Sequence, residues 1–175
     1  MTQRQVVIDV ETTGLSPRQG HRVIEIGAVA LNSGSIIDEF HSLLCVPQFI
    51  SRDAHRIHGI TNSMLIGQPS PEEVFPRFRT FIENSTLIAH NAKFDMGFLR
   101  SEFARLRLPL DRPCICTLEL SRNTYPFLKN HRLETVYRHV CGPQSTVVQK
   151  HRAIADARMA AAIYLRITQN RVSGK

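Results

Sequence analysis

The sequence contains no run of about 18 consecutive apolar residues, so no transmembrane helix is expected. Its first residues pass directly into a strand-like segment and lack the apolar stretch and cleavage site of a secretory signal peptide. The four cysteines are too scattered for a disulfide framework and lack paired zinc-ligand spacing; Cys114 and Cys116 better fit two positions of one buried strand. These absences favour a cytoplasmic, reducing compartment.

Internal repeats, low-complexity tracts and linkers of domain length are also missing. With 175 residues and 42% hydrophobic composition, the chain is expected to form one compact domain over residues 1–175. The net charge is +7 and the pI is about 9.7, with an excess made mostly of arginine. Arginine forks onto phosphate oxygens, which favours a nucleic acid partner, although basic charge alone often serves only solubility.

The hydrophobic pattern indicates strands first, then strands alternating with helices. Residues 5–10 resemble an apolar strand with no clean alternation, as in a central strand covered on both faces. A turn at residues 32–34 joins the next two expected strands. The expected strands are 5–10, 22–31, 35–46, 86–90 and 113–116, and the expected helices are about 70–82, 91–106, 118–122, 131–140 and 153–169. This order predicts an α/β fold in which helices flank a mixed five-stranded sheet.

Two carboxylates stand two positions apart at the end of the first expected strand, Asp9 and Glu11. Because strand side chains alternate between faces, both would project from the same face. Two adjacent carboxylates on a buried strand repel each other and lose hydration, which costs several kcal/mol unless cations neutralise them. The alternative is a strand end where both acids reach solvent or pair with arginines.

Asp156 lies near the start of the last expected helix, on the same stripe as the apolar residues three, four, seven and eleven positions on. That stripe should pack on the sheet, so Asp156 is either a residue of the capping type or a metal ligand facing the core. Asp95 lies in the first turn after Asn91, where complementing the helix dipole is the ordinary explanation. Each acid taken alone has such an ordinary explanation, but four acids at the edges of apolar elements are harder to explain in this way together.

His151 precedes Asp156 by five residues, a rotation of roughly 140° on a continuous helix. The two side chains would then not face one point, so His151 is expected on the loop that leads into the helix. From there it could swing toward Asp156. A histidine in so basic a segment is otherwise usually a solvated surface residue.

Together, the four carboxylates and one histidine fit two-metal phosphodiester hydrolysis. Oxygen ligands suit two Mg²⁺ or Mn²⁺ ions, and few thiols or paired histidines compete for a zinc site. Such ions sit about 3.5–4 Å apart, one activating water and one stabilising the leaving oxygen. An imidazole is suited to take the proton of that water near neutral pH.

Three segments resemble the exonuclease motifs of the DEDD superfamily: DVETTG at 9–14, HNAKFD at 90–95 and HRAIAD at 151–156. A histidine five positions before the last aspartate is typical of the branch that uses histidine (DEDDh). The chain is most similar to the DnaQ-like group, typified by the proofreading epsilon subunit of bacterial DNA polymerase III. VIEIGAV at 23–29 and IHGIT at 57–61 also match, and the resemblance spans residues 5–168.

The resemblance implies a ribonuclease H-like fold and 3′–5′ exonuclease activity. It implies that Asp9, Glu11, Asp95 and Asp156 hold two metal ions and that His151 is the general base. Leu15 would be a wedge between the last bases of the substrate. The other implied substrate contacts are Thr12, Asp53, Ile57, His58 and Phe94, whose ordinary roles would be in the core or in loops. Glu25 lies outside the three motifs and is interpreted as structural, paired inside the fold.

The expected substrate is a single-stranded or frayed 3′ end of DNA, from which nucleoside 5′-monophosphates leave one at a time. The cations expected to hold the substrate backbone are Lys129, Arg132, Lys150 and Arg152. RNA trimming by the same motifs is the alternative, and an inert nucleic-acid or polymerase-binding module is a third possibility that the intact acids disfavour. A polymerase partner is compatible with the resemblance, but the chain has no long segment after the last motif of the kind that binds the polymerase.

Overall fold

A five-stranded mixed sheet forms the centre of the computed structural model, which describes residues 4–142 and 151–172. The strands are β1 (Arg4–Thr12), β2 (Val23–Asn32), β3 (Ser35–Leu43), β4 (Ser85–Ala89) and β5 (Cys114–Cys116), in the order β3-β2-β1-β4-β5. β2 is antiparallel to β1 and to β3, whereas β4 is parallel to β1 and to β5. The predictions of a mixed five-stranded sheet and of a central first strand are confirmed.

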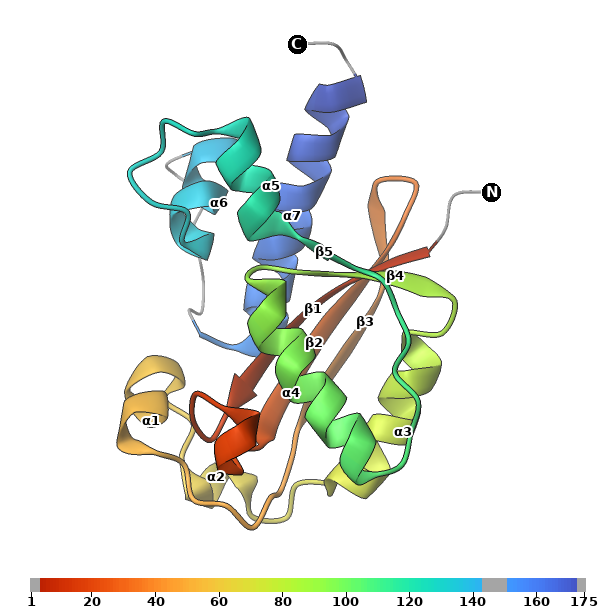
Figure 1. Cartoon of the computed structure of the whole chain (residues 1–175), viewed down its shortest axis with the longest axis vertical. Helices are drawn as coiled ribbons and strands as arrows, with labels where there is room; N and C mark the ends of the chain where they lie inside the picture. Colours follow the sequence, from red (N-terminus) through yellow and green to blue (C-terminus); the bar gives the residue numbers. More distant parts are fainter. Residues whose placement is uncertain (1–3, 143–150, 173–175) are drawn as a thin grey trace.

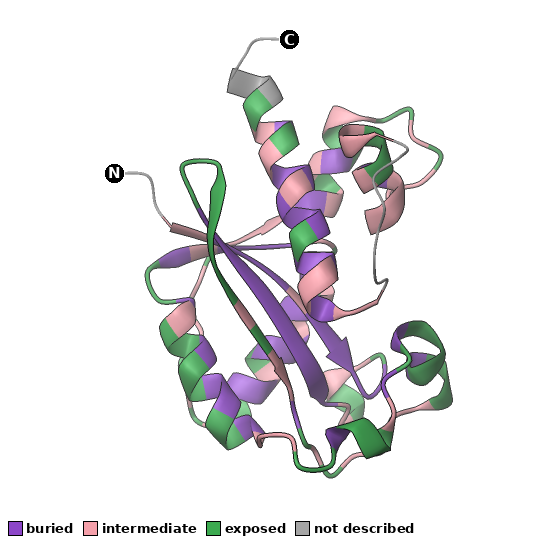
Figure 2. Cartoon of the chain, turned by 180° about the vertical axis from the view of Figure 1, so that it is seen from behind, coloured by how far each residue is buried: buried purple, intermediate pink, exposed green. Residues whose placement is uncertain are grey.

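Helices cover both faces of this sheet. The helices are α1 (Arg52–His58), α2 (Asn62–Leu65), α3 (Pro71–Phe81), α4 (Ala92–Arg105), α5 (Thr117–Thr124), α6 (Leu133–Cys141) and α7 (Ala153–Val172). In Figure 1, α4 lies in front of the sheet, and in Figure 2, seen from behind, α7 crosses the other face. Val6, Ile8 and Val10 of β1 pack with α3 and α4, and Val7 packs with α7. Within the described residues, no helix is both long and apolar enough to cross a bilayer.

Local sequence signals account for the main turns and helix starts. Ser33 and Gly34 both have positive φ, as a tight hairpin between β2 and β3 requires. Ser70 and Glu73 form a capping box around Pro71, the first residue of α3. Asn91 has a φ of 68°, a left-handed conformation that asparagine tolerates well. The chain therefore turns from β4 into α4 within two residues.

Two short helices, α1 and α2, were not expected from the pattern, and neither was a 3-10 turn at Pro17–Gln19. Each helix begins at a hydroxyl cap: Ser51 accepts from the Ala54 N–H and Thr61 from the Met64 N–H. Cys114 and Cys116 do lie on one strand, β5, but both are half-buried rather than buried. The remaining boundaries differ from the expected ones by a few residues.

Candidate active site

Asp9 and Glu11 project from β1 toward the α7 face of the sheet, the face that Val7 also occupies. This follows from strand alternation and confirms that the two carboxylates share a face. Opposite them on β2, Asp9 pairs with Gly27 and Glu11 pairs with Glu25. Three acids are therefore grouped around one end of two neighbouring strands.

Gly27 lets α7 approach this end of the sheet directly. A Cβ atom built on Gly27 would lie 2.3 Å from the carbonyl carbon of Ala153 and 2.3 Å from the amide nitrogen of Ile154. No side chain fits into that space. The first turn of α7 therefore lies on the β2 backbone, and Asp156 in that turn is brought to the acids of β1. Carboxylate oxygens of Asp9, Glu11 and Asp156 all lie within 4.8 Å of one another.

Asp95 approaches from the first turn of α4. Its side chain is buried, and Oδ1 accepts a hydrogen bond of 3.2 Å from the backbone N–H of Val10, between the two acids of β1. Its charge is also the largest electrostatic influence on Asp9. All four predicted acids are thus close together, although Asp95 is outside the group of three whose oxygens lie within 4.8 Å.

Burial raises the pKa of each of these acids, and the charges of neighbouring acids add to it for Asp9, Glu11 and Asp156. Burial, followed by the charge of Asp95, raises the pKa of Asp9 well above its usual value. Burial and the charge of Asp156 raise the pKa of Glu11 to about 8. Burial raises the pKa of Asp95 to about 8, and burial with the charge of Glu134 raises the pKa of Asp156 to about 7. The cluster therefore opposes its own ionisation at neutral pH.

The donor set of this cluster fits a divalent cation. Oδ1 of Asp156 is buried and has no hydrogen-bond partner among the described residues. A buried carboxylate oxygen without a partner, in a residue grouped with two other carboxylates, is costly unless a cation satisfies it. All the converging atoms are oxygens, which suits Mg²⁺ or Mn²⁺ rather than softer metals.

His151 lies just before α7, as predicted, with a φ of 57°. Its backbone N–H donates a hydrogen bond to the Asp156 carboxyl group, while its ring is directed elsewhere: Nε2 lies 3.9 Å from Oε1 of Glu134, on α6. The imidazole is 42% exposed. Glu134, which influences both His151 and Asp156, was not singled out from the sequence, because a single acid at a helix start resembles ordinary dipole complementation.

Glu25 is the buried anchor of this end of α7. Its fully buried carboxylate accepts from Arg152 at 2.8–3.2 Å, from the Ala153 N–H at 3.1 Å and from Nε2 of His41 at 2.6 Å. Burial raises its pKa, but these hydrogen bonds outweigh that effect and hold the pKa below its usual value. The interpretation of Glu25 as a paired structural residue is therefore supported by its contacts.

The same contacts bear on one prediction. Arg152 was expected to hold the substrate backbone, and its Nε and Nη2 are paired with Glu25, so that part of the guanidinium has a structural role. Its contact with a substrate phosphate stays a prediction. Lys150 lies outside the described residues. Lys129 and Arg132 are exposed near the start of α6.

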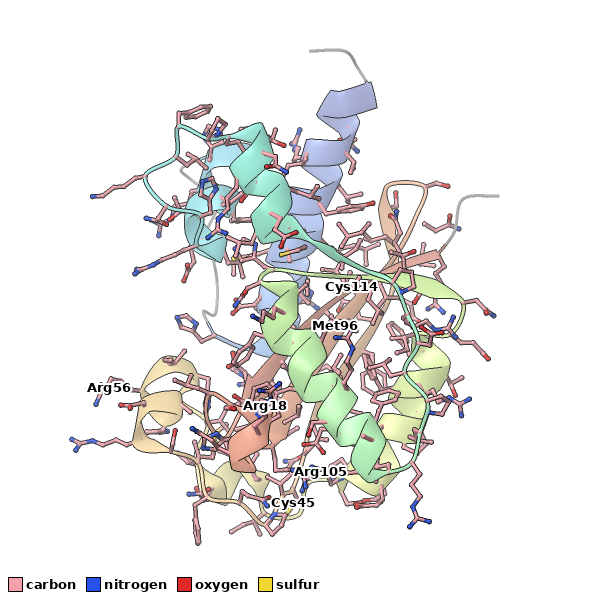
Figure 3. All side chains as sticks on the ribbon, viewed as in Figure 1. Arg18, Cys45, Arg56, Met96, Arg105 and Cys114 are labelled. Atoms are coloured by element: carbon pink, nitrogen blue, oxygen red, sulfur yellow. The ribbon has the colours of Figure 1, made fainter. Side chains whose placement is uncertain are left out.

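The residues expected to contact substrate fall into two groups around the cluster. Thr12 is buried, its carbonyl faces Nε2 of His58 at 3.1 Å, and the burial of His58 lowers the pKa of that imidazole. Ile57, next to it on α1, is 51% exposed. Asp53 points into solvent and pairs with Arg56 at 3.5 Å; Figure 3 shows Arg56 on the outer side of α1. Of the residues expected on α1, Asp53 is thus the one most clearly turned to solvent.

The second group lines a hollow of about 480 Å³ between the loop after β1 and α4. Leu15 lines it with 68% of its surface exposed, and Phe94, in ring contact with Phe98, lines the opposite side. Arg18 (labelled in Figure 3) and Lys93 also line this hollow, so it combines apolar surface with positive charge. Neither cation was singled out from the sequence, because both lie outside the acidic motif positions.

Comparison with known proteins gives this geometry a context. Residues 6–164 match the RNase_T family, described as exonuclease. A PolC-type DNA polymerase III from Thermotoga petrophila is 42% identical over 166 residues, which are 94% of this chain and 12% of that protein. The PolC-type DNA polymerase III of Bacillus subtilis is 39% identical over 168 residues, again 94% of this chain and 11% of that protein. The chain thus spans about an eighth of the length of these curated relatives.

Solved structures share the fold. Exonuclease X in complex with 5′ overhanging duplex DNA has a TM-score of 0.76 and 28% identity, covering 98% of this chain and 93% of that one. E. coli exonuclease I with a dT13 oligonucleotide has a TM-score of 0.86 at 18% identity, covering 99% and 43%. The nuclease domain of 3′hExo, a DEDDh family member bound to rAMP, has a TM-score of 0.79 at 19% identity, covering 96% and 92%. The predicted ribonuclease H-like fold is confirmed.

Proposed function

Because the chain belongs to the RNase_T exonuclease family and is a 3′–5′ exonuclease of the DEDDh type, we propose that it releases nucleoside 5′-monophosphates from single-stranded or frayed 3′ ends of DNA. The observation that carries the proposal is the convergence of Asp9, Glu11 and Asp156 within 4.8 Å, with Asp95 beside them. An inert binding module would have no use for so costly a cluster.

Two divalent cations, Mg²⁺ or Mn²⁺, would be held by Asp9, Glu11, Asp95 and Asp156. The unpartnered Oδ1 of Asp156 and the raised pKa values of the acids support this ligand set. When bound, such ions supply an activated water and stabilise the leaving oxygen. Bound cations would thereby neutralise the repulsion among the carboxylates.

His151 would accept a proton from the attacking water. Its backbone is fixed to the Asp156 carboxyl group while its ring is partly exposed, so a change of side-chain rotamer could bring the imidazole from Glu134 toward the cluster. In the structure the His151 ring does not face the acids. The ring would therefore turn toward the acids when a substrate binds.

The terminal nucleotides would lie between the two groups of residues beside the cluster. Leu15 and Phe94 offer apolar and ring surfaces that replace lost base stacking. Thr12, Ile57 and His58 would border the other side of the terminal nucleotide, and Asp53 would reach it only by leaving Arg56. Unstacking a paired end costs a few kcal/mol, so frayed ends should react faster than paired ones.

The curated relatives favour DNA over RNA, because their names are those of DNA polymerases. By the same relation, a role in DNA replication or repair, contact with a polymerase and a cytoplasmic location are parts of the proposal. Residues 1–175 would act as one exonuclease domain, since the family match covers residues 6–164. RNA trimming is retained as an outcome of the test.

The test is digestion of strands labelled at the 5′ end, in matched single-stranded DNA, paired duplex, mismatched duplex and RNA. With Mg²⁺ or Mn²⁺ the labelled DNA should shorten from its 3′ end, fastest for single strands and mismatched ends. Excess EDTA should stop the reaction, and a 3′-phosphate should block it. Release of the label as the first mononucleotide, cutting of closed circles, or full activity in EDTA would contradict the proposal. If RNA were digested faster than DNA, RNA would replace DNA as the proposed substrate.

A further inference from the structure

Three rings form a cluster at one end of the α5–α6 pair, away from the acids. Tyr125 directly follows α5, Phe127 lies in the α5–α6 loop, and His139 lies near the end of α6. The ring centroids of Tyr125 and His139 are 4.7 Å apart. The ring centroid of Phe127 lies 5.5 Å from that of His139 and 6.2 Å from that of Tyr125. We call these three residues the aromatic platform.

Packing of the core does not account for Phe127. Tyr125 packs against the cluster of buried residues formed by Val136, Ile163 and Ile167, but Phe127 does not belong to that cluster. Its side chain is 71% exposed, on the loop that Figure 2 shows as exposed. Tyr125 therefore fixes the platform to the fold, while Phe127 leaves aromatic surface open to a partner.

The surroundings of the platform are positively charged. Between Leu120 and Leu133 the sequence contains no acidic residue. Four exposed cations belong to this segment and to the adjoining helix: Arg122, Lys129, Arg132 and Arg138. Across the described residues, none of the four takes part in an ion pair. Open aromatic surface beside unpaired cations is the combination that binds single-stranded nucleic acid, because bases stack on the rings and phosphates meet the charges.

The platform is also fixed in position relative to the candidate active site. His90 directly follows β4, and its Nε2 contacts the backbone oxygen of His131 at 2.9 Å. Ser121 contacts Nδ1 of His131 at 3.0 Å. Glu134, which faces His151, is five residues before His139 on α6. Five helical residues span about 7.5 Å along the axis and turn by roughly 140° around it, so Glu134 and His139 leave α6 on different sides. A strand whose 3′ end lies at the acids would therefore pass partly around α6 and would need several nucleotides to reach the rings.

We propose that the aromatic platform binds a base of the single strand several nucleotides before the 3′ end, with Lys129 and Arg132 contacting the intervening phosphates. The inference rests on the proposed exonuclease function, and it adds a second contact that acts on long strands only. The platform should not affect KM for a substrate too short to reach it. The proposal therefore predicts that the contribution of the platform to KM depends on strand length.

The experiment compares Phe127→Ala with the unmodified chain on two kinds of substrate. One is the p-nitrophenyl ester of thymidine 5′-monophosphate, which occupies the active site alone, and the other is a series of oligothymidylates of increasing length. KM for the longest strands should rise roughly 5- to 100-fold in the variant, since stacking contributes about 1–3 kcal/mol per base. The kcat for all substrates and both kinetic constants for the ester should be unchanged.

Two matched variants control this experiment. Phe127→Trp keeps a stacking surface and should restore the KM of long strands. Phe49→Ala removes another highly exposed phenylalanine, 84% exposed, outside the platform, and should leave KM unchanged. Thermal unfolding of each variant shows that the fold is intact.

A Phe127→Ala variant whose KM matches that of the unmodified chain at every length would overturn the platform while leaving the exonuclease function standing. An unmodified chain that degrades neither the ester nor the oligothymidylates would instead overturn the proposed function itself. An equal rise in KM for the ester and for long strands would also contradict the platform, because it would place Phe127 at the active site.

Discussion

Arg152 donates hydrogen bonds through Nε and Nη2 to both carboxylate oxygens of Glu25, a residue 127 positions earlier in the chain. The pair connects β2 to the residue that directly follows the candidate base, His151. The adjacent Ala153 N–H binds the same carboxylate, so the first turn of α7 is attached at two points. Any shift of this attachment moves His151 and Asp156 together.

Arg152→Lys should therefore lower kcat while the acids still bind metal. A lysine keeps the charge but loses the forked contact with Glu25, and small displacements of reacting groups cost up to about 100-fold in rate. We expect kcat to fall about 10- to 100-fold, with the Mn²⁺-induced rise in Tm largely retained. Arg158→Lys is the matched control, since Arg158 pairs with Glu39 farther along α7 on the surface. If kcat fell equally in the two variants, the Glu25–Arg152 pair would have no specific role in positioning His151 and Asp156.

Gly27→Ala should destabilise the protein strongly. The new Cβ would lie 2.3 Å from backbone atoms of Ala153 and Ile154, which cannot move like a side chain. Overpacking of this kind costs about 1–3 kcal/mol or more. Gly97→Ala is the control: nothing lies within 4 Å of a Cβ on Gly97, within α4, and the change should stabilise the fold by roughly 0.5–1 kcal/mol. Denaturant unfolding measures both, and a neutral Gly27→Ala would show that α7 does not need this close approach.

These two contacts mark the limit of what the sequence predicts. Alternation along β1 places Asp9 and Glu11 on one face, and the mostly apolar segment without clean alternation indicates a central strand; both are confirmed. Such signals are local and repeat with the period of the element. The pairing of Glu25 with Arg152 and the approach of α7 at Gly27 depend on how distant elements dock, which local patterns do not encode. The structural role of Arg152 as the partner of Glu25 was consequently not predicted.

The short helices α1 and α2 escaped prediction for a different reason. With seven and four residues, they are too short for an apolar stripe to recur. Only the caps, Ser51 and Thr61, could have indicated them. The position of the His151 loop was predicted correctly from helical rotation, whereas the proximity of its ring to Glu134 again required the docked helix α6.

The metal-free protein should become less stable between pH 7 and pH 9. The pKa values of Glu11 and Asp95 are raised to about 8 and that of Asp156 to about 7, so the folded state binds these protons more tightly than the unfolded state. Stability from this source is complete below the unfolded pKa of about 4 and is lost as pH rises through 7–8. Scanning calorimetry in EDTA should show Tm falling over this window.

Two additions identify the acid cluster as the cause of that fall. Asp9→Asn removes one charge and should both raise Tm at pH 9 in EDTA and flatten the dependence on pH. Saturating Mn²⁺ should raise Tm more at pH 9 than at pH 7, because ligands must be deprotonated to bind metal. A Tm in EDTA that stays constant from pH 7 to pH 9, in the unmodified chain as in Asp9→Asn, would contradict the raised pKa values.

His151→Ala should reduce kcat by about 10²–10⁴-fold, the usual contribution of a general base, with little change in KM. The expected separation follows from the geometry: Leu15 and Phe94 line the hollow for the terminal nucleotides, whereas the His151 ring lies beside Glu134. His139→Ala provides the opposite control, since His139 belongs to the aromatic platform and should alter only KM, and only for long strands. Single-turnover kinetics on a long oligothymidylate and on the p-nitrophenyl ester distinguish the two effects. If the His151→Ala variant had unchanged single-turnover rates on both substrates, His151 would be a solvated surface residue and another group would be the general base.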